Sequence, residues 1–169
     1  MQLKTFLKGI DRISDWSGRI FVWLIIPLTA LVVFEVISRR IFNAPHIWAT
    51  EVTNYIYGPH FMLVAAFTLL YKGHVSIDII FQRFSKRWQG IIECFNYLVF
   101  FFPFCFIIFQ QGMVFALTSW KIHETSATAT LPIVPEIKTV IPITFALLLI
   151  QGLANFTRSI MLAVKGKEI

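Results

Sequence analysis

Long apolar runs alternate with short polar stretches along this chain, a pattern that predicts membrane-spanning helices. About 20 consecutive apolar residues are enough to cross the hydrocarbon core of a bilayer as a helix. Four runs reach that length, at about residues 20–38, 47–71, 89–118 and 139–164. The connections between them hold the charged and turn-forming residues. We therefore expect an all-α integral membrane protein with four transmembrane helices, in a single membrane domain over residues 1–169.

The third run is longer than a membrane requires. Residues 89–118 would make about 45 Å of helix, against a hydrocarbon core of about 30 Å. Such a helix must tilt, kink or project into water. Pro103 is the expected position of a kink, because proline lacks the amide hydrogen that a helix interior uses.

Two further segments are amphipathic rather than uniformly apolar. In residues 1–17, apolar side chains recur at helical spacing with charged side chains between them, and the stretch at about 75–88 has the same character. Helices of this kind lie along the membrane surface. We expect both segments to be interfacial helices. The first does not read as a cleaved signal peptide, because no small-residue cleavage site follows it.

Composition and charge exclude a water-soluble fold and set an orientation. Apolar residues make up 57% of the chain and charged residues 14%, which a soluble domain of 169 residues could not easily keep in solution. The net charge of +6 does not indicate a nucleic-acid partner, since in a membrane protein the location of Lys and Arg is what matters. The two terminal segments and the second connection hold eleven of them, and the other two connections hold four. The positive-inside rule then places both termini in the cytoplasm.

Ionisable side chains in or beside the spans are few, and each is costly there unless it is paired. Glu35 and Arg39 are one helical turn apart, and Glu51 follows Arg39 and Arg40 across a short turn. These four residues predict an ion-pair cluster that fixes the hairpin of the first two spans. Two other roles stay open: a proton or cation site at Glu35 or Glu51, and contact with a partner subunit.

A second ion pair is expected near the cytoplasmic face. Glu93 and Arg158 reach similar depth if the last two spans form an antiparallel hairpin. The amide side chains of Gln110, Gln111 and Asn155 are polar enough to join neighbouring helices by hydrogen bonds. A structural role is the favoured interpretation, and a substrate role for the three amides stays open.

The distribution of the histidines disfavours a cofactor site. His60 lies alone in the middle of the second span, and we interpret it as a hydrogen-bonded packing residue. A haem would need a second axial ligand on a facing helix, and the other three spans contain no histidine. His46, His74 and His123 fall in connections on opposite sides of the membrane, so they cannot share a metal ion. With no nucleophile beside a base and no phosphate-binding loop, we expect neither an enzyme nor a cofactor.

Three segments together resemble a known family. They are RRIFNAPHIWATEVTNYIY from residue 39, KGHVSIDIIFQRF from residue 72, and LPIVPEIKTVIPITFALLLIQGL from residue 131. Their order and spacing resemble the small membrane subunit of tripartite ATP-independent periplasmic (TRAP) transporters, the DctQ/SiaQ family, over roughly residues 10–160. Beyond the candidate ion pairs, the matching positions, which are candidate motif or subunit-interface residues, are Phe42, Asn43, Pro45, Trp48, Gly73, His74, Val75, Asp78, Pro132, Pro135 and Lys138.

The resemblance implies a role as well as a fold. In that family the small subunit pairs with a much larger membrane subunit that holds the substrate and sodium sites, and a soluble periplasmic protein delivers an organic acid. It implies as partners a large membrane subunit, a periplasmic substrate-binding protein and membrane lipids, and it implies the bacterial inner membrane as location. Sialic acid is slightly favoured over a C4-dicarboxylate as the imported acid. The small subunit would scaffold and anchor the large one without binding substrate.

Two other classes of protein stay open. A four-helix small exporter acting as a homodimer would use one membrane carboxylate, for which Glu35 is the candidate. A haem-carrying membrane anchor of a respiratory complex would use His60. The position of Glu35 beside Arg39 near the end of its span disfavours the first, and the distribution of histidines disfavours the second.

Overall fold

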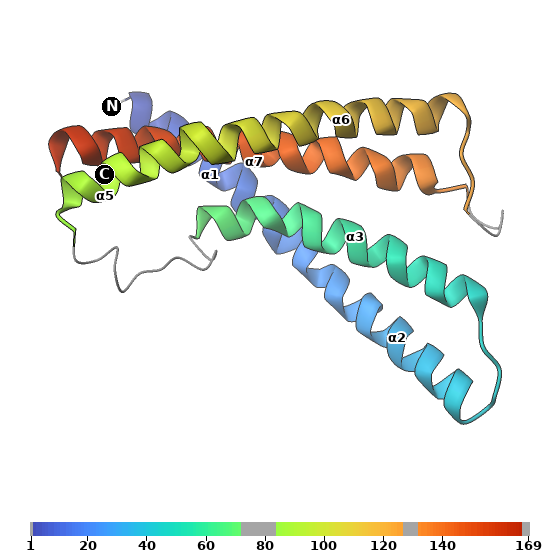
Figure 1. Cartoon of the computed structure of the whole chain (residues 1–169). Helices are drawn as coiled ribbons and strands as arrows, with labels where there is room; N and C mark the ends of the chain where they lie inside the picture. The colour runs from blue at the N-terminus through green and yellow to red at the C-terminus, as the bar shows by residue number, and fades with distance from the viewer. Residues whose placement is uncertain (1, 72–83, 127–131, 167–169) are drawn as a thin grey trace.

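The computed structural model describes residues 2–71, 84–126 and 132–166, and every regular element within these ranges is a helix. Figure 1 shows them in chain order. They are α1 (Gln2–Phe21), the 3₁₀ turn η1 (Val22–Leu24), α2 (Ile25–Arg40), α3 (Ile47–Leu70), α5 (Lys86–Asn96), the π-helical turn η2 (Tyr97–Phe101), α6 (Phe102–Lys121) and α7 (Val134–Lys165). The expected all-α fold class is confirmed.

The helices form two antiparallel pairs of rods (Figure 1). α1, η1 and α2 make one continuous rod, beside which α3 returns; α5, η2 and α6 make a second rod, along which α7 returns. The two pairs cross where α1 and the end of α3 meet α7, and they diverge toward the opposite end. The chain therefore starts and finishes at the same end of the molecule, and the turns after α2 and α6 lie at the other end.

Three helical stretches are long and apolar enough to cross a membrane, by length and composition. They are Thr5–Arg40, Lys86–Lys121 and Val134–Lys165, and they contain the first, third and fourth predicted spans. α3 coincides with the second predicted span, and its 24 residues correspond to about 36 Å. α3 is not among the three stretches that meet this criterion, and it contains polar residues, among them Glu51, Asn54 and His60. Three of the four expected spans thus meet the criterion.

The first of the two amphipathic segments continues directly into the first span, and most of the second lies outside the described residues. Residues 2–17 belong to α1, which runs without a break into the first span, and Leu7, Ile10 and Ser14 pack inside the protein. No turn signal separates the amphipathic part from the apolar run, and each further residue adds a backbone hydrogen bond. Of the segment at 75–88, residues 75–83 lie outside the described residues, and Lys86 already begins α5.

Each long rod contains one irregular turn shortly before a proline. η1 precedes Pro27, and η2 ends two residues before Pro103. Proline donates no hydrogen bond, so the regular backbone ladder is interrupted in the turn before it, and a π-helical turn is one way in which a helix absorbs this. The irregularity expected at Pro103 is therefore present as a wide turn on its N-terminal side.

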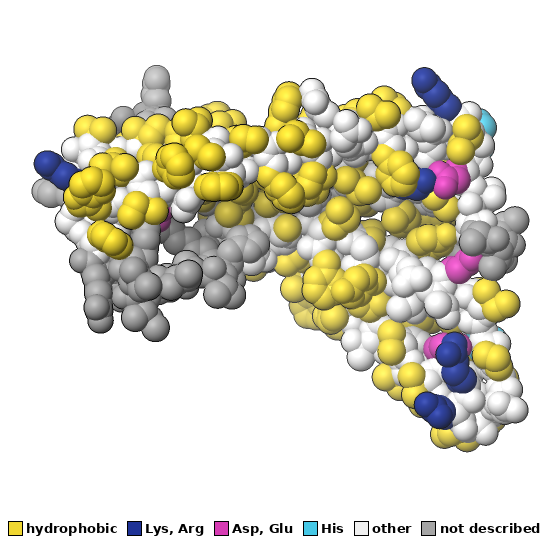
Figure 2. All heavy atoms as spheres, viewed as in Figure 1, with side chains coloured by type: hydrophobic (Ala, Val, Ile, Leu, Met, Phe, Trp, Pro, Cys, Tyr) yellow, Lys and Arg dark blue, Asp and Glu magenta, His cyan; other side chains and the backbone are white. Residues whose placement is uncertain are grey.

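Large apolar side chains cover much of the outer surface. Figure 2 shows them spread over both pairs of rods on the face in view, and residues such as Phe100 and Phe104 are about 60% exposed. A continuous apolar surface of this kind is a liability in water. It suits a protein whose outer faces contact lipid or other membrane helices.

α5 and α7 approach each other closely at Gly90. A Cβ atom placed on Gly90 would lie 2.5 Å from the backbone nitrogen of Ala163 and 2.8 Å from the carbonyl oxygen of Ser159. Because both neighbours are backbone atoms, no change of rotamer can make room. Small residues at such crossings are what allow membrane helices to pack tightly.

Gly90→Ala is therefore expected to destabilise the protein by about 1–3 kcal/mol, the usual cost of overpacking. The matched control is Gly9→Ala, because a Cβ at Gly9 meets nothing within 4 Å and alanine is the better helix former. Thermal unfolding of the two variants in the same detergent measures the difference. Equal unfolding temperatures would contradict the close approach of α5 and α7.

Candidate functional site

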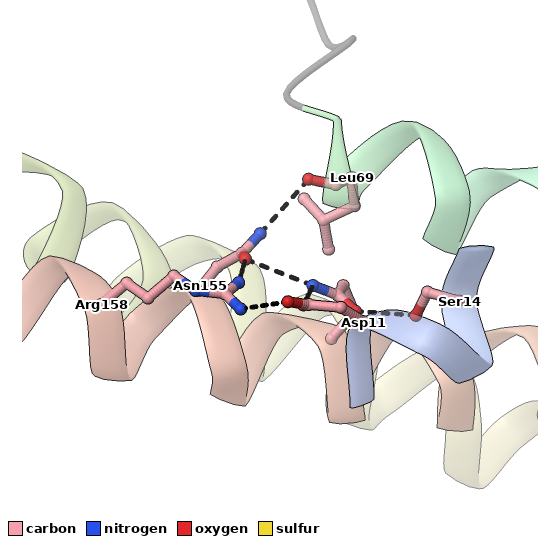
Figure 3. Close-up of polar contacts among 6 residues, drawn as sticks. Asp11, Ser14, Leu69, Asn155 and Arg158 are labelled. Atoms are coloured by element: carbon pink, nitrogen blue, oxygen red, sulfur yellow. Dashed lines mark hydrogen bonds and ion pairs between the residues drawn. The ribbon is translucent and has the colours of Figure 1, made fainter. Parts of the chain in front are cut away.

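α7 carries a stripe of polar side chains at its crossing with α1. Gln151, Asn155 and Arg158 are spaced by four and three residues, so they share one face of α7. Asp11 and Ser14, three residues apart, share one face of α1. Figure 3 shows Asp11 and Ser14 facing Asn155 and Arg158 across the gap between the two helices. We refer to these five residues as the crossing network.

Gln151 is the centre of the crossing network and is 0% exposed. Its Oε1 atom accepts a hydrogen bond of 2.7 Å from the Ser14 hydroxyl. Its Nε2 atom donates to Asp11 Oδ1 at 3.2 Å and to Asn155 Oδ1 at 3.3 Å. Both ends of the amide are thus used, as a buried amide requires.

Asn155 extends the crossing network to a third helix. Its Nδ2 atom donates to the carbonyl oxygen of Leu69 at 3.2 Å, in the last turn of α3, where carbonyls lack partners within their own helix. Arg158 donates to Asn155 Oδ1 at 2.9 Å and forms an ion pair with Asp11 Oδ2 at 2.5 Å. One set of side chains therefore ties α1, α3 and α7 together.

The chemistry of the crossing network indicates a structural role, that of joining α1, α3 and α7. No side-chain nitrogen or oxygen of the crossing network is buried without a hydrogen-bond partner. In an apolar interior each unsatisfied group would cost about 1–3 kcal/mol, and hydrogen bonds between membrane helices contribute about 0.6–2 kcal/mol each. The buried polar side-chain atoms of the crossing network are thus all used in contacts that hold the helices together.

These contacts confirm that Asn155 joins helices, and they give Arg158 a partner, Asp11, that the sequence did not predict. Asn155 joins helices as expected, whereas Gln110 and Gln111 lie exposed on α6. Arg158 forms an ion pair with Asp11, and the pairing of Arg158 with Glu93 stays a prediction. The signal that could have identified Asp11 is its position one turn from Ser14 on a stripe of α1 that packs inward.

Glu93 joins a different pair of helices. Its Oε2 atom accepts a hydrogen bond of 2.5 Å from the hydroxyl of Ser159, whose oxygen also lies 3.1 Å from the carbonyl oxygen of Asn155. The contact lies next to the close approach of Gly90 to the backbone at Ser159. Glu93 therefore links α5 to α7, next to the network that links α7 to α1 and α3.

Glu35 organises the turn between α2 and α3. Its side chain pairs with Arg39 at 3.1 Å and accepts a hydrogen bond of 3.3 Å from the backbone N–H of His46. The His46 Nδ1 atom lies 3.5 Å from the second carboxylate oxygen. The rings of Phe34, His46 and Trp48 pack against one another beside this contact, in tilted and edge-to-face arrangements. Of the predicted cluster, Glu35 and Arg39 thus come together.

The other members of that cluster lie nearby. Arg40 ends α2 and is exposed, and it lines a groove with Glu35 and Arg39. Glu51 is half-buried in the first part of α3. The family-motif residues of this turn are Phe42, which is exposed, Asn43, whose φ of +50° turns the chain, and Pro45.

His60 packs against the first rod. It is 8% exposed, and its Nδ1 atom lies 2.9 Å from the carbonyl oxygen of Phe21. A carbonyl only accepts, so this nitrogen carries the hydrogen. In the 3₁₀ turn the N–H of Ile25 bonds to the carbonyl of Val22. The carbonyl of Phe21, to which this N–H would bond in a regular α-helix, is therefore able to accept the hydrogen bond from the histidine. The expectation of a hydrogen-bonded packing histidine agrees with this contact.

A second turn is closed at the start of α7. Lys138 pairs with Glu124 and lies 3.9 Å from the centre of the Phe115 ring, and Ser119 donates to the same carboxylate at 2.7 Å. The hydrogen bonds from Lys138 and Ser119 hold the pKa of Glu124 below its ordinary value. This contact gives the motif residue Lys138 a structural role that its spacing did not reveal.

The remaining predicted residues are placed as follows. Pro132 precedes α7, and Pro135 is buried at its second position, where a missing N–H costs nothing. Gly73, His74, Val75 and Asp78 lie outside the described residues. Within residues 2–71, 84–126 and 132–166, no group of three His, Cys, Asp or Glu side chains could hold a metal ion.

The fold and these contacts define a multi-pass helical membrane protein whose buried polar groups join its helices. Residues 28–161 match the family described as tripartite ATP-independent periplasmic transporters, DctQ component. The match covers more than half of the chain, so the chain belongs to this family. It is a component of a transporter rather than an enzyme, and the resemblance to the small TRAP subunit is confirmed.

A curated relative is the sialic acid TRAP transporter permease protein SiaT of Haemophilus influenzae (strain 86-028NP). It is 26% identical over 104 residues, which are 61% of this chain and 16% of that protein. The chain therefore spans about one sixth of the length of this relative. No solved structure matches the chain significantly.

Asn155→Leu is expected to destabilise the protein by about 1–3 kcal/mol, because it leaves Gln151, Arg158 and the Leu69 carbonyl short of a partner in an apolar interior. Gln110→Leu removes a similar amide from an exposed position and serves as the control. Urea unfolding in detergent compares the two free energies of unfolding. A loss as large for Gln110→Leu would show that the crossing network contributes nothing specific.

Proposed function

We propose that this chain is the small permease subunit of a TRAP transporter that imports an organic acid with sodium, and that it scaffolds and anchors the large transport subunit without binding substrate. The observation that carries this proposal is the use of the buried polar side chains. Gln151, Asn155 and Arg158 bond to other helices of the same chain. Glu35 is likewise held by Arg39 and His46.

The path of the chain supports a four-span topology with both termini in the cytoplasm. The two ends of the chain lie at the same end of the molecule, as an even number of crossings requires. α3 is long enough to cross and packs against α1 and α7 through Asn155 and His60 contacts. The excess of Lys and Arg in the terminal segments and second connection favours that end as the cytoplasmic one. Membership of the family supports the bacterial inner membrane as the location.

The outer surface supports a subunit role. Exposed aromatic side chains follow α5 and α6, with Phe95, Phe100, Phe104 and Phe106 all more than half exposed. Such a surface needs lipid or a partner helix against it. We propose that the large membrane subunit covers part of this surface, and that the long rods give it a fixed frame to move against. The sequence of residues 75–88 adds an interfacial anchor to this proposal.

The proposed substrate is supported by the name of the curated relative SiaT. That protein is named a sialic acid transporter permease, and this chain matches about one sixth of it. We therefore favour sialic acid over a C4-dicarboxylate. A periplasmic substrate-binding protein would deliver the acid, as in the family, and the residues that recognise it would lie on the partner chains.

Two other classes of function fit less well. A homodimeric exporter would need Glu35 to exchange protons, but this carboxylate is paired with Arg39 and accepts the His46 N–H. A haem anchor would need His60, whose Nδ1 atom bonds to the Phe21 carbonyl. Its other ring nitrogen has no second histidine opposite it in α2, α6 or α7.

Purification of an affinity-tagged copy from its native membrane in mild detergent tests the proposal. We expect one large polytopic partner at one-to-one stoichiometry, and we expect Glu35→Gln to keep most of the organic-acid uptake of cells that carry the complex. A homodimer without a partner would contradict the subunit role. Abolished uptake by Glu35→Gln in an intact complex would contradict the assignment of transport chemistry to other chains.

A further inference from the structure

A groove runs between α2 and α3 at the end where the turn joins them. It has a volume of about 380 Å³ and is lined by Val32, Glu35, Val36, Arg39, Arg40, Thr50, Thr53 and Asn54. The residues from α2 recur at helical spacing, so the groove follows one face of that helix over two turns. It is separate from the crossing network, which lies where α1 and the end of α3 meet α7.

The lining of the groove changes from apolar to cationic along α2. Val32 and Val36 are 42% and 55% exposed and form the part nearer the middle of the span. Arg39 and Arg40 stand at the end of the helix, about 12 Å from Val32 along the axis. An occupant that matches this lining has an apolar chain and an anionic group at one end.

The charges of the groove leave one cation uncompensated. Arg39 uses one nitrogen on Glu35, whose carboxylate also accepts the His46 N–H. Arg40 forms no ion pair with any residue that the structure describes. Two guanidinium groups thus face one carboxylate, an excess of one positive charge, which corresponds to one phosphodiester. Guanidinium groups bind phosphate oxygens through paired hydrogen bonds.

We propose that this groove is a binding site for one phospholipid. Arg40 and the free edge of Arg39 bind the phosphate, and an acyl chain lies along Val32 and Val36. A free phosphate would leave the apolar half of the groove uncovered. A partner helix would bury the uncompensated charge of Arg40 unless it brought a carboxylate. The membrane supplies a molecule with both parts at the depth where a span ends.

Native mass spectrometry of the purified protein, with the subunits that copurify, tests this site with added phosphatidylglycerol. Arg40→Gln is expected to weaken retention of one lipid by about tenfold, the effect of losing a charge-assisted hydrogen bond. Lys121→Gln is the matched control, since Lys121 is an exposed cation that ends α6 and does not line the groove. Val36→Trp, which fills the apolar half without changing charge, is expected to lower retention as well.

The outcomes separate a lipid from the other occupants. Equal lipid retention in Arg40→Gln and Lys121→Gln would overturn the proposal, and so would full retention in Val36→Trp. Competition by inorganic phosphate as strong as that by a short-chain phosphatidylglycerol would show a site for the anion alone. A photo-crosslinker at Val36 that captures a copurifying protein instead of lipid would assign the groove to a subunit interface. Thermal unfolding of each variant confirms that it is folded.

Discussion

The burial of a few hydrogen-bonding groups in an apolar surrounding is the constraint on which the rest of this structure depends. Where water is absent, a polar side chain finds its partner on a neighbouring helix or remains unsatisfied at a cost of about 1–3 kcal/mol. Gln151 has such partners on α1 and within α7, and Asn155 has one on α3. Apolar contacts alone favour many packings of lipid-facing helices, whereas this set of bonds is satisfied in one crossing.

That crossing sets the shape of the molecule. The two pairs of rods meet at the crossing network, part-way along α7, and diverge toward the end that carries the turns after α2 and α6 (Figure 1). Each of these turns is closed by its own contact. Glu35 and His46 close the first turn, and Glu124 and Lys138 close the second. A frame whose crossing network is fully hydrogen-bonded, and whose outer surface is apolar, suits the proposed role, in which substrate and ion chemistry belong to a larger partner.

The sequence predicts the helices well and their polar partners less well. Apolar runs of about 20 residues or more can hardly form anything but spans, so the runs at 20–38, 89–118 and 139–164 all lie within long helical stretches. Asn155 could be predicted as a helix-joining residue from chemistry alone. The pairing of Arg158 with Asp11 could not, because it depends on the angle at which α1 crosses α7, and 147 residues separate the two. The continuity of α1 with the first span cannot be predicted, because an amphipathic pattern does not reveal which surface its apolar face covers.

The most direct test of the crossing network is the distance between the two turns it holds apart. After replacement of Cys94 and Cys105, spin labels at positions 42 and 122 allow this distance to be measured by double electron–electron resonance. Our account predicts a single narrow distribution, which broadens when Gln151→Leu is added. A distribution that Gln151→Leu leaves unchanged would contradict the claim that this network fixes the two pairs of rods relative to each other.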